Sequence, residues 1–337
     1  MFFLEYFSLV SRKALTSEYD FKSAFIANQI IAVMAGIIGG IFTVNFMEYC
    51  LRRFAFWKAL LLIITVYIFS ALLISAIGVS YIESENFGLP LLHPEVIEEV
   101  SFFFISWEFI KQFIIWLFIV VVTLIVLMVN DKYGPGVFPD YLMGRYFIPK
   151  KERRIFMFAD IKNATGIAEA LGEQKYFNFL KDFFRDIAPA IVQTKGEVYQ
   201  YVGDEVVVSW KMKQGLKHAN ALQCFYLMKK RITSLSKNYE KKYAAIPHFK
   251  VGFHYGSVMV GELGKIKREI AFSGDVLNTT SRIQAKCNAL GVDILASESF
   301  ANINVNLADD FEIISMGVQE LRGKTEDVPL VTFRHKN

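Results

Sequence analysis

Three long stretches without a charged side chain dominate the first part of the chain. They are Ala24–Met47, Ala59–Ile82 and Gln112–Asn130. As a helix, each is long enough to cross a bilayer, which takes roughly 20 apolar residues. A shorter apolar stretch, Phe2–Val10, is either an interfacial helix or part of a fourth crossing. We therefore expect residues 1–131 to form an α-helical transmembrane domain with three spans, or four.

The segments between these stretches differ in charge. Glu83–Glu108 contains six glutamates and neither Lys nor Arg, whereas Arg52–Lys58 and the chain after Asp131 are basic. The positive-inside rule places the acidic segment outside and everything after Asp131 in the cytoplasm of a multi-pass inner-membrane protein. Three spans would put the N-terminus outside, although Arg12 and Lys13 there favour the inside.

The three apolar stretches contain no Asp, Glu, Lys or Arg. Ion and proton transporters need ionisable groups within the membrane, so this pattern argues against a transporter. An anchor or a sensor is the better interpretation. Its partner is either the lipid bilayer alone, an extracytoplasmic ligand at the acidic segment, or another membrane protein.

A change of pattern follows. Residues 132–152 contain Gly134-Pro135-Gly136, Pro139 and Pro149, which break a continuous helix and predict a linker, either a tether or a signal-relaying connector. From Arg153 to the end, residues 153–337 alternate between strand and helix patterns, which predicts one domain of the α+β or α/β class. Its expected strands are Ile155–Ala159, Glu197–Val202, Glu205–Trp210, Phe249–Tyr255, Asp293–Leu295, Phe311–Ile314 and Leu330–Phe333.

Helices are expected between these strands. The first runs from Ile167 to about Val192, the second over Leu216–Leu235, and the third over Val276–Leu290. A glycine-rich turn is expected through Gly261 and Gly264, after the fourth strand.

Composition agrees with a partly membrane-embedded chain. Of 337 residues, 53% are hydrophobic, and the mean hydropathy is +0.33. Residues 132–337 carry 30 basic against 22 acidic side chains. This surplus suits a polyanionic small substrate or an anionic membrane surface. Nucleic acid is not an expected partner, because no basic stripe is interleaved with aromatic residues. Cys50, Cys224 and Cys287 lie too far apart for a metal-ligand motif.

Two carboxylates lie at strand ends. Gly203-Asp204 forms the predicted two-residue turn of a hairpin, and Asp160 follows the apolar strand Ile155–Ala159. Asp204 alone would fit an ordinary surface turn. If the two strands are neighbours, however, both carboxylates converge on an oxygen-only site that suits Mg²⁺ or Mn²⁺ beside a phosphate.

Two further features suit phosphate chemistry. The loop Ile161–Gly166 runs into a helix N-terminus, where backbone N–H groups bind anions. Asn278 and Arg282 lie four residues apart and share a helix face, from which they could stabilise charge on a transferring phosphoryl group. Their spacing alone is more typical of a solvated helix face.

Together, these features resemble one family. From about Arg153 to Phe333 the chain is similar to the catalytic domain of class III nucleotidyl cyclases, of a bacterial membrane-anchored type. The motifs that match are Phe158-Ala159-Asp160-Ile161 with Thr165, Tyr201-Val202-Gly203-Asp204, Gly274-Asp275-Val276-Leu277-Asn278 with Arg282, and Arg322-Gly323-Lys324.

The resemblance implies a ferredoxin-like βαββαβ core and a two-metal reaction. Asp160, Asp204 and the carbonyl of Ile161 would bind two Mg²⁺ or Mn²⁺ ions. The ribose 3′-hydroxyl of a nucleoside triphosphate would attack the α-phosphate and expel pyrophosphate. Asn278 would orient the ribose, and Arg282 would stabilise the transition state. The β- and γ-phosphates would be bound by the backbone of Asn163, Ala164 and Thr165 and by Arg322 or Lys324.

The family also builds each site between two protomers arranged head to tail. The metal ligands come from one protomer, and the Asn and Arg come from the other. A homodimer would therefore hold two sites, and a monomer would hold none.

The resemblance is weakest at the base-reading positions. Adenylyl cyclases commonly have a lysine where this chain has Gln200, and an Asp or Thr where it has Ala271. The Glu and Cys of guanylyl cyclases are absent as well. Because adenylyl cyclases are the commoner enzymes, we expect cAMP formation from ATP for second-messenger signalling, with GTP or a pyrimidine triphosphate as the alternative.

Two other classes of protein compete with this interpretation. A catalytically silent pseudo-cyclase is disfavoured, because such modules typically lose some of the residues that this chain retains at 160, 204, 278 and 282. A diguanylate cyclase would explain Gly203-Asp204-Glu205 but has no counterpart to the helix with Asn278 and Arg282.

Overall fold

The computed structural model describes residues 56–133, 143–266, 269–303, 310–324 and 327–336, with six single helical residues between positions 21 and 37. The expected segments Phe2–Val10 and, apart from five single residues, Ala24–Met47 lie outside this part of the chain. The chain divides into two compact units, Met1–Met128 and Val129–Asn337.

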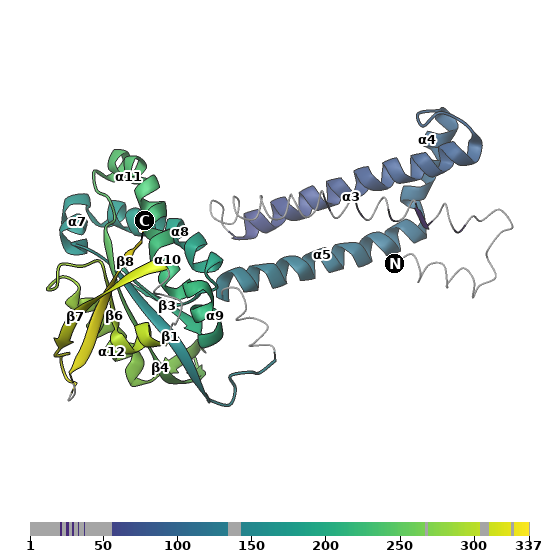
Figure 1. Cartoon of the computed structure of the whole chain (residues 1–337). Coiled ribbons are helices and arrows are strands. Elements are labelled where there is room, and N and C mark those ends of the chain that lie inside the picture. The colour runs from purple at the N-terminus through teal and green to yellow at the C-terminus, as the bar shows by residue number, and fades with distance from the viewer. Residues whose placement is uncertain are drawn as a thin grey trace. The chain divides into compact units, whose positions relative to one another are not determined.

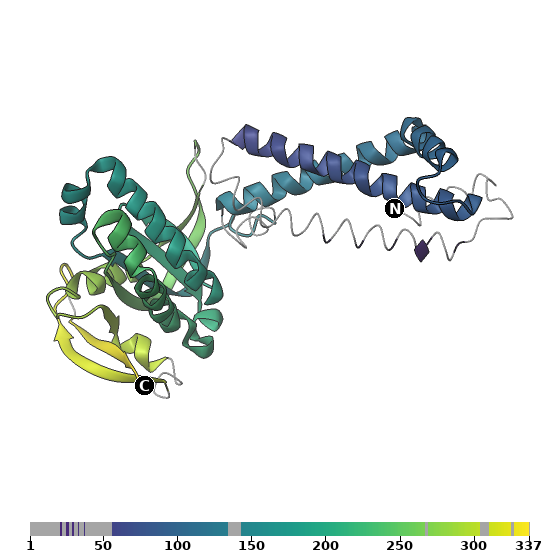
Figure 2. The same ribbon diagram turned by 90° about the horizontal axis from the view of Figure 1, so that it is seen from above.

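The first unit is helical. Its described elements are α3 (Phe56–Phe87), α4 (Pro94–Ile105) and most of α5 (Trp107–Tyr133). α3 and α5 lie side by side (Figures 1 and 2) and pack through a small apolar cluster: Ile63, Val120 and Leu124, with Tyr67 and Trp116 in ring contact at 5.9 Å.

Two stretches of these helices are long and apolar enough to cross a membrane. They are Leu60–Phe87 and Phe109–Leu127. Within the part of the chain that the structure describes, only 11% and 12% of their most apolar windows are buried, so the described residues leave most of this apolar surface uncovered. They coincide with the second and third expected spans. The total of three or four spans remains a prediction.

The second unit is built on a mixed sheet of eight strands. Seven follow the order β2-β3-β1-β4-β6-β8-β7, and β5 pairs with β4. β4 and β6 are parallel, and the other pairs are antiparallel. The strands are β1 (Lys150–Ile161), β2 (Glu197–Val202), β3 (Glu205–Lys211), β4 (Phe249–Leu263), β5 (Glu269–Ser273), β6 (Ile294–Ser297), β7 (Phe311–Gln319) and β8 (Val328–His335).

Helices connect these strands. α7 and α8 join β1 to β2, and α9 to α11 join β3 to β4, so β1 to β4 form the βαββαβ core that was expected. The helices of this unit are α7 (Ala164–Leu171), α8 (Glu173–Gln193), α9 (Met212–Leu216), α10 (Asn220–Ser234), α11 (Ser236–Tyr243), α12 (Asp275–Lys286) and α13 (Glu298–Asn302), with a short 3₁₀ turn at Lys217–Ala219.

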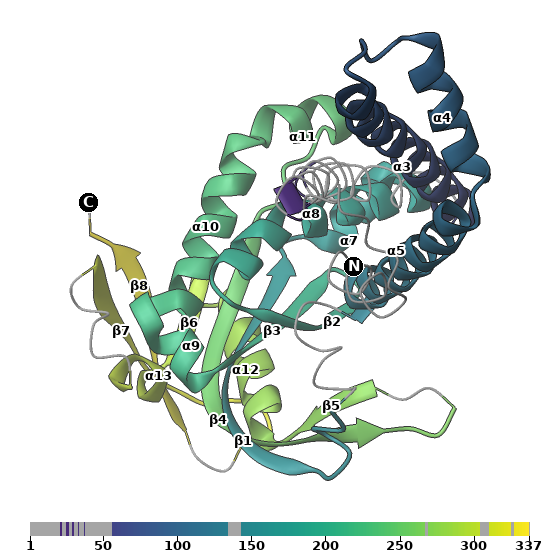
Figure 3. The same cartoon turned by 90° about the vertical axis from the view of Figure 1, so that its right-hand side faces the viewer.

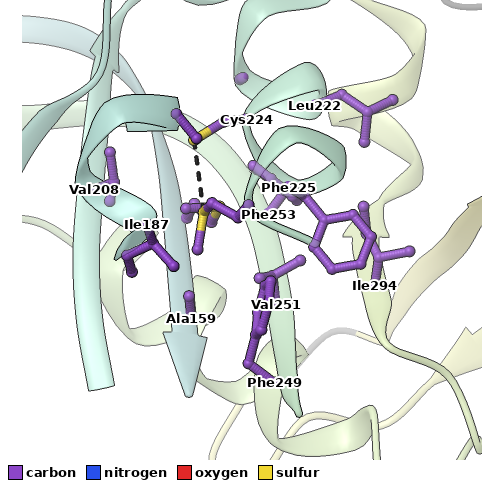
Figure 4. Close-up of a cluster of buried hydrophobic side chains, with 14 of the residues drawn as sticks. Ala159, Ile187, Val208, Leu222, Cys224, Phe225, Phe249, Val251, Phe253 and Ile294 are labelled. Carbon is purple, nitrogen blue, oxygen red and sulfur yellow. Dashed lines mark hydrogen bonds between the residues drawn. The ribbon is translucent and has the colours of Figure 1, made fainter. Parts of the chain in front are cut away.

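The two faces of β1 pack against different layers, because successive side chains of a strand point to opposite sides. Ile155, Met157 and Ala159 face the layer that contains α8 and α10. Figure 4 shows part of this main core, with Ala159 among side chains of other strands and both helices. Phe156 and Phe158 belong to a second apolar cluster with residues of β3, β4 and α12. Figure 3 shows α8 and α10 along one side of the sheet.

Three expectations about this unit were wrong in detail. Gly261 is not in a turn: it lies inside β4, paired with Ala271 of β5. A Cβ there would lie 3.1 Å from Pro149, so the glycine serves a close approach rather than a change of direction. The expected helix up to Val192 is two helices, because Gly172 between α7 and α8 has φ 73°. Strand β5 and the short helices α11 and α13 were not anticipated.

Candidate active site

The two candidate metal ligands meet at one end of the central strands. Asp160 is the penultimate residue of β1 and pairs in register with Glu205 of β3. Asp204 directly precedes Glu205, in the turn where Gly203 takes φ 60°. Burial, hydrogen bonding to Asp160 and the negative charge of Asp160 together raise the pKa of Asp204 to about 6. The hairpin aspartate is therefore no ordinary surface turn residue.

Negative charge accumulates around this pair. Burial raises the pKa of Glu205 to about 7, and the charges of Asp160 and Asp204 add to the effect. Burial and the same two aspartates also raise the pKa of Tyr176 on α8. Opposing them, the ammonium group of Lys250 lies 3.3 Å from Oδ2 of Asp160 and lowers the pKa of both Asp204 and Glu205.

The donor set fits a hard divalent cation. Two adjacent carboxylates, of which Asp204 has a raised pKa because of burial and its neighbour's negative charge, are the arrangement that Mg²⁺ or Mn²⁺ stabilises. Within the described ranges, no group of three or more His, Cys, Asp or Glu residues forms a complete metal site. The remaining ligands would thus be backbone oxygen, water and substrate phosphate. Ile161, the candidate carbonyl donor, is the last residue of β1, and its side chain is buried in the main core.

The expected phosphate-binding loop directly follows β1. Asn163 takes a left-handed conformation, φ 54°, and α7 begins at Ala164. A Cβ at Gly166 would lie 2.8 Å from the Asn163 side chain, so glycine permits this tight start. The backbone of Ala164 and Thr165 forms the first turn of α7, within five residues of Asp160.

The two predicted transition-state residues, Asn278 and Arg282, lie on α12. Asn278 is exposed, and Arg282 is half-buried. The Arg282 guanidinium lies against the turn at Gly323, where a Cβ would be 3.4 Å from Nη2. In the same turn, Lys324 forms an ion pair of 2.8 Å with Asp275. Among the described residues, no hydrogen bond or ion pair joins Asn278 or Arg282 to the carboxylate pair. The neighbouring Arg322 is exposed.

The two predicted base-reading positions lie on β2 and β5, strands whose side chains meet over one face of the sheet. Gln200 is an exposed residue of β2, and Ala271 is half-buried in β5. Their chain neighbours Tyr199 and Phe272 are in ring contact at 4.8 Å, and the backbone N–H of Phe272 donates to the Tyr199 hydroxyl at 3.4 Å. The structure therefore brings both positions to the same end of the domain.

Two polar contacts of Asp160 were missed by sequence reasoning. They are Lys250 and Gln284, whose Nε2 donates to Oδ2 of Asp160 at 3.0 Å. Lys250 is the one Lys, Arg, Asp or Glu within the expected strand Phe249–Tyr255, which is a signal that the sequence does show. No local pattern in the sequence marks Gln284, because its contact with Asp160 depends on how α12 packs on the sheet.

Comparison with known proteins identifies the domain. Residues 149–333 match the family model described as the adenylate and guanylate cyclase catalytic domain. The chain belongs to this family.

Relatives of this cyclase domain occur in several bacteria. Adenylate cyclase 2 of Rhizobium meliloti (strain 1021) is 30% identical over 172 residues, which are 51% of this chain and 47% of that protein. The adenylate cyclase of Anabaena cylindrica is 26% identical over 185 residues, which are 53% of this chain and 36% of that one. The chain thus matches less than half the length of either relative.

Solved structures share the cyclase fold. A bacterial light-regulated adenylyl cyclase is similar with a TM-score of 0.53 and 20% identity, covering 64% of this chain and 63% of that one. The adenylyl cyclase CyaB from P. aeruginosa is similar with a TM-score of 0.50 and 18% identity, covering 56% of this chain and 97% of that one. The expected class III cyclase family is confirmed.

Proposed function

We propose that this protein is a membrane-bound nucleotidyl cyclase that converts ATP to 3′,5′-cyclic AMP and pyrophosphate. The observation that carries the proposal is the pairing of the half-buried carboxylates of Asp160 and Asp204, in a domain of the cyclase family. The names of the curated relatives support ATP as the substrate. Gln200 and Ala271 do not select adenine by themselves, so the base is the part that most needs a direct test.

The proposed reaction is one displacement at the α-phosphorus, in which different residues of the chain have different roles. A bond forms between the ribose 3′-oxygen and the α-phosphorus, and the bond from the α-phosphorus to the oxygen bridging to the β-phosphate breaks. Asp160 and Asp204 would hold Mg²⁺ or Mn²⁺, two ions per site, with the Ile161 carbonyl. When bound, these ions favour ionisation of the 3′-hydroxyl and neutralise charge on the departing pyrophosphate.

Other residues would position the nucleotide. Backbone N–H groups at Asn163, Ala164 and Thr165 would donate to the β- and γ-phosphates, because a helix N-terminus favours anions. Arg322 or Lys324 would add positive charge there. Gln200 and Ala271 would face the base.

We infer that the active form is a homodimer with shared sites. Asn278 and Arg282 would orient the ribose and stabilise the negative charge of the transition state in the partner's site. Their lack of any described contact with the carboxylates of their own chain supports this division. So does the exposure of Asn278, which leaves it accessible to a second protomer.

The apolar helices support a membrane anchor. α3 and α5 expose long apolar surfaces, which bilayer hydrocarbon would cover. We propose a multi-pass inner-membrane protein with a cytoplasmic catalytic domain, residues 1–131 as the membrane domain and 132–152 as the linker. An extracytoplasmic ligand or a membrane-protein partner would act through the membrane domain.

The first experiment tests activity and substrate together. The full chain in detergent is incubated with Mn²⁺ and each of the four nucleoside triphosphates, and the products are resolved by mass. We expect cyclic AMP and pyrophosphate, their loss in Asp204→Asn, and unchanged activity in the surface control Glu312→Gln. If only another triphosphate gave a cyclic product, that triphosphate would be the substrate in place of ATP. Nucleotide binding without any cyclic product would contradict the proposed activity and indicate a catalytically silent signalling module.

The second experiment tests the shared site. Asp204→Ala and Arg282→Ala protomers are each expected to be inactive. Random mixing restores one intact site in each heterodimer, which gives about one quarter of wild-type activity for a two-fold dimer. An inactive mixture that still contains heterodimers would argue against division of the site.

A further inference from the structure

We propose that Gln284 is a positioning residue that fixes the orientation of Asp160, and that Lys250 sets how much negative charge the carboxylate pair offers to a cation. The inference rests on the proposed function, because it assigns roles around the same carboxylates. Neither residue belongs to the motifs by which the sequence resembles its family.

Both residues act on one oxygen atom. Nε2 of Gln284 donates to Oδ2 of Asp160 at 3.0 Å, and Nζ of Lys250 lies 3.3 Å from that same oxygen. The amide must present its NH₂ group here, since the reverse orientation would bring two acceptors together. Both donors are buried, Gln284 at 5% and Lys250 at 8% exposure. Both contacts go to Oδ2 of Asp160, and Oδ1 is the oxygen that we assign to a metal ion.

The fold brings Gln284 to this point by close packing. Along β4, Lys250 pairs with Asp160 and Gly252 pairs with Phe158. A Cβ at Gly252 would lie 2.5 Å from the backbone nitrogen of Gln284, so only glycine lets α12 approach β4 so closely. The amide can reach across to β1 because of this approach.

An apolar residue would be the ordinary choice at the position of Gln284. The other buried residues of α12 are Val276, Thr279, Thr280 and Ile283, none of which carries an amide, and burial of an amide is costly unless it is hydrogen-bonded. The described hydrogen bond of the Gln284 side chain goes to Asp160. Glutamine restrains the carboxylate without adding charge, which a hydrophobic side chain could not do.

Lys250 acts differently, through its charge. It reduces the net negative charge of the carboxylate pair before any cation binds, and so weakens the attraction for a free divalent ion. The triphosphate supplies the missing negative charge when metal and nucleotide bind together. The two residues should therefore have opposite effects on binding of metal alone.

The experiment measures Mn²⁺ binding by the full chain in detergent, without nucleotide, from the electron paramagnetic resonance signal of free Mn²⁺. Steady-state rates with Mn²⁺ and ATP are measured in parallel. Gln284→Met is expected to weaken Mn²⁺ binding by about tenfold or more, the usual loss when an outer partner of a metal ligand is removed. The Mn²⁺ concentration for half-maximal activity should rise by the same factor. Lys250→Met is expected to tighten binding of Mn²⁺ alone.

Thr280→Val is the matched control. It removes a buried hydrogen bond of 2.6 Å within α12 and leaves the carboxylates untouched, so Mn²⁺ binding should not change. Should Gln284→Met fail to fold, Gln284→Asn keeps the amide but shortens the side chain by one methylene, and the same loss of Mn²⁺ affinity is expected.

The outcomes separate the two proposals. Wild-type Mn²⁺ affinity in folded Gln284→Met or Gln284→Asn would overturn the positioning role, while cyclase activity of the wild type would still support the function. Weaker Mn²⁺ binding in Lys250→Met would overturn the role assigned to its charge. A wild-type chain that neither binds Mn²⁺ nor forms cyclic product would refute the proposed function itself.

Discussion

Replacement of Gly252 by alanine should loosen the contact between α12 and the sheet. The added Cβ would lie 2.5 Å from the backbone nitrogen of Gln284 and 2.7 Å from its Cα and Cβ. On the other side, β4 cannot retreat, because Gly252 is paired with Phe158 of β1 and Leu295 of β6. The helix must move instead.

The size of the effect follows from these distances. Non-bonded heavy atoms attract best at about 3.5–4.0 Å, so α12 has to shift by about 1 Å. Overpacking of this kind costs about 1–3 kcal/mol. We expect the upper part of that range, because the obstructing atoms are mostly backbone. The shift also moves the Gln284 amide away from Asp160, so Mn²⁺ affinity should fall with stability.

Two buried cysteines provide the assay. Cys287 follows α12 directly, whereas Cys224 lies on α10, against the other face of the sheet. Burial raises the pKa of each thiol to about 12, so a thiol reagent labels them only after opening. Mass-resolved labelling should accelerate about tenfold or more at Cys287, the equivalent of 1.4 kcal/mol or more. The rate at Cys224 should change less if opening is local to α12.

Gly256→Ala is the graded comparison. Its Cβ would lie 3.1 Å from the side chain of Val276, which can adjust, so a smaller acceleration is expected. Wild-type labelling of Cys287 in Gly252→Ala would refute the close packing of α12 on β4 and the argument built on it.

Three further predictions concern pH and stability. Without divalent ions, the stabilising contribution of Asp204 and Glu205 should be lost as pH rises from about 4 to about 7. Their pKa values are raised to about 6 and about 7, so the folded state retains protons that the unfolded state releases. Urea unfolding of Asp204→Asn should show a flatter dependence of stability on pH. Arg154→Met should lower the free energy of unfolding by about 3 kcal/mol, because this fully buried guanidinium is paired with two glutamates. The exposed neighbour change Arg153→Met should stay within about 0.5 kcal/mol in the same denaturation series. Tyr239→Phe should cost about 1–2 kcal/mol in thermal unfolding, because the phenol donates to a buried α8 carboxylate at 2.7 Å.

Local patterns in the sequence determined much of this protein. The apolar run before Asp160, the two arms around Gly203-Asp204 and the amphipathic helix with Asn278 and Arg282 were all readable, because strand period, turn chemistry and helix period are properties of neighbouring residues. The order of the resulting motifs also indicated the family, which the comparisons confirm.

The tertiary structure decided what surrounds the carboxylates. Gln284 lies 124 positions from Asp160 in sequence, and only the register of β4 on β1 and the packing of α12 at Gly252 bring them into contact. The glycine at 261 was misread for the same reason, since Pro149 approaches it from a distant part of the chain. Such contacts depend on sheet order and helix approach, which no local period encodes, so the residues that tune the site emerge only when the chain is folded.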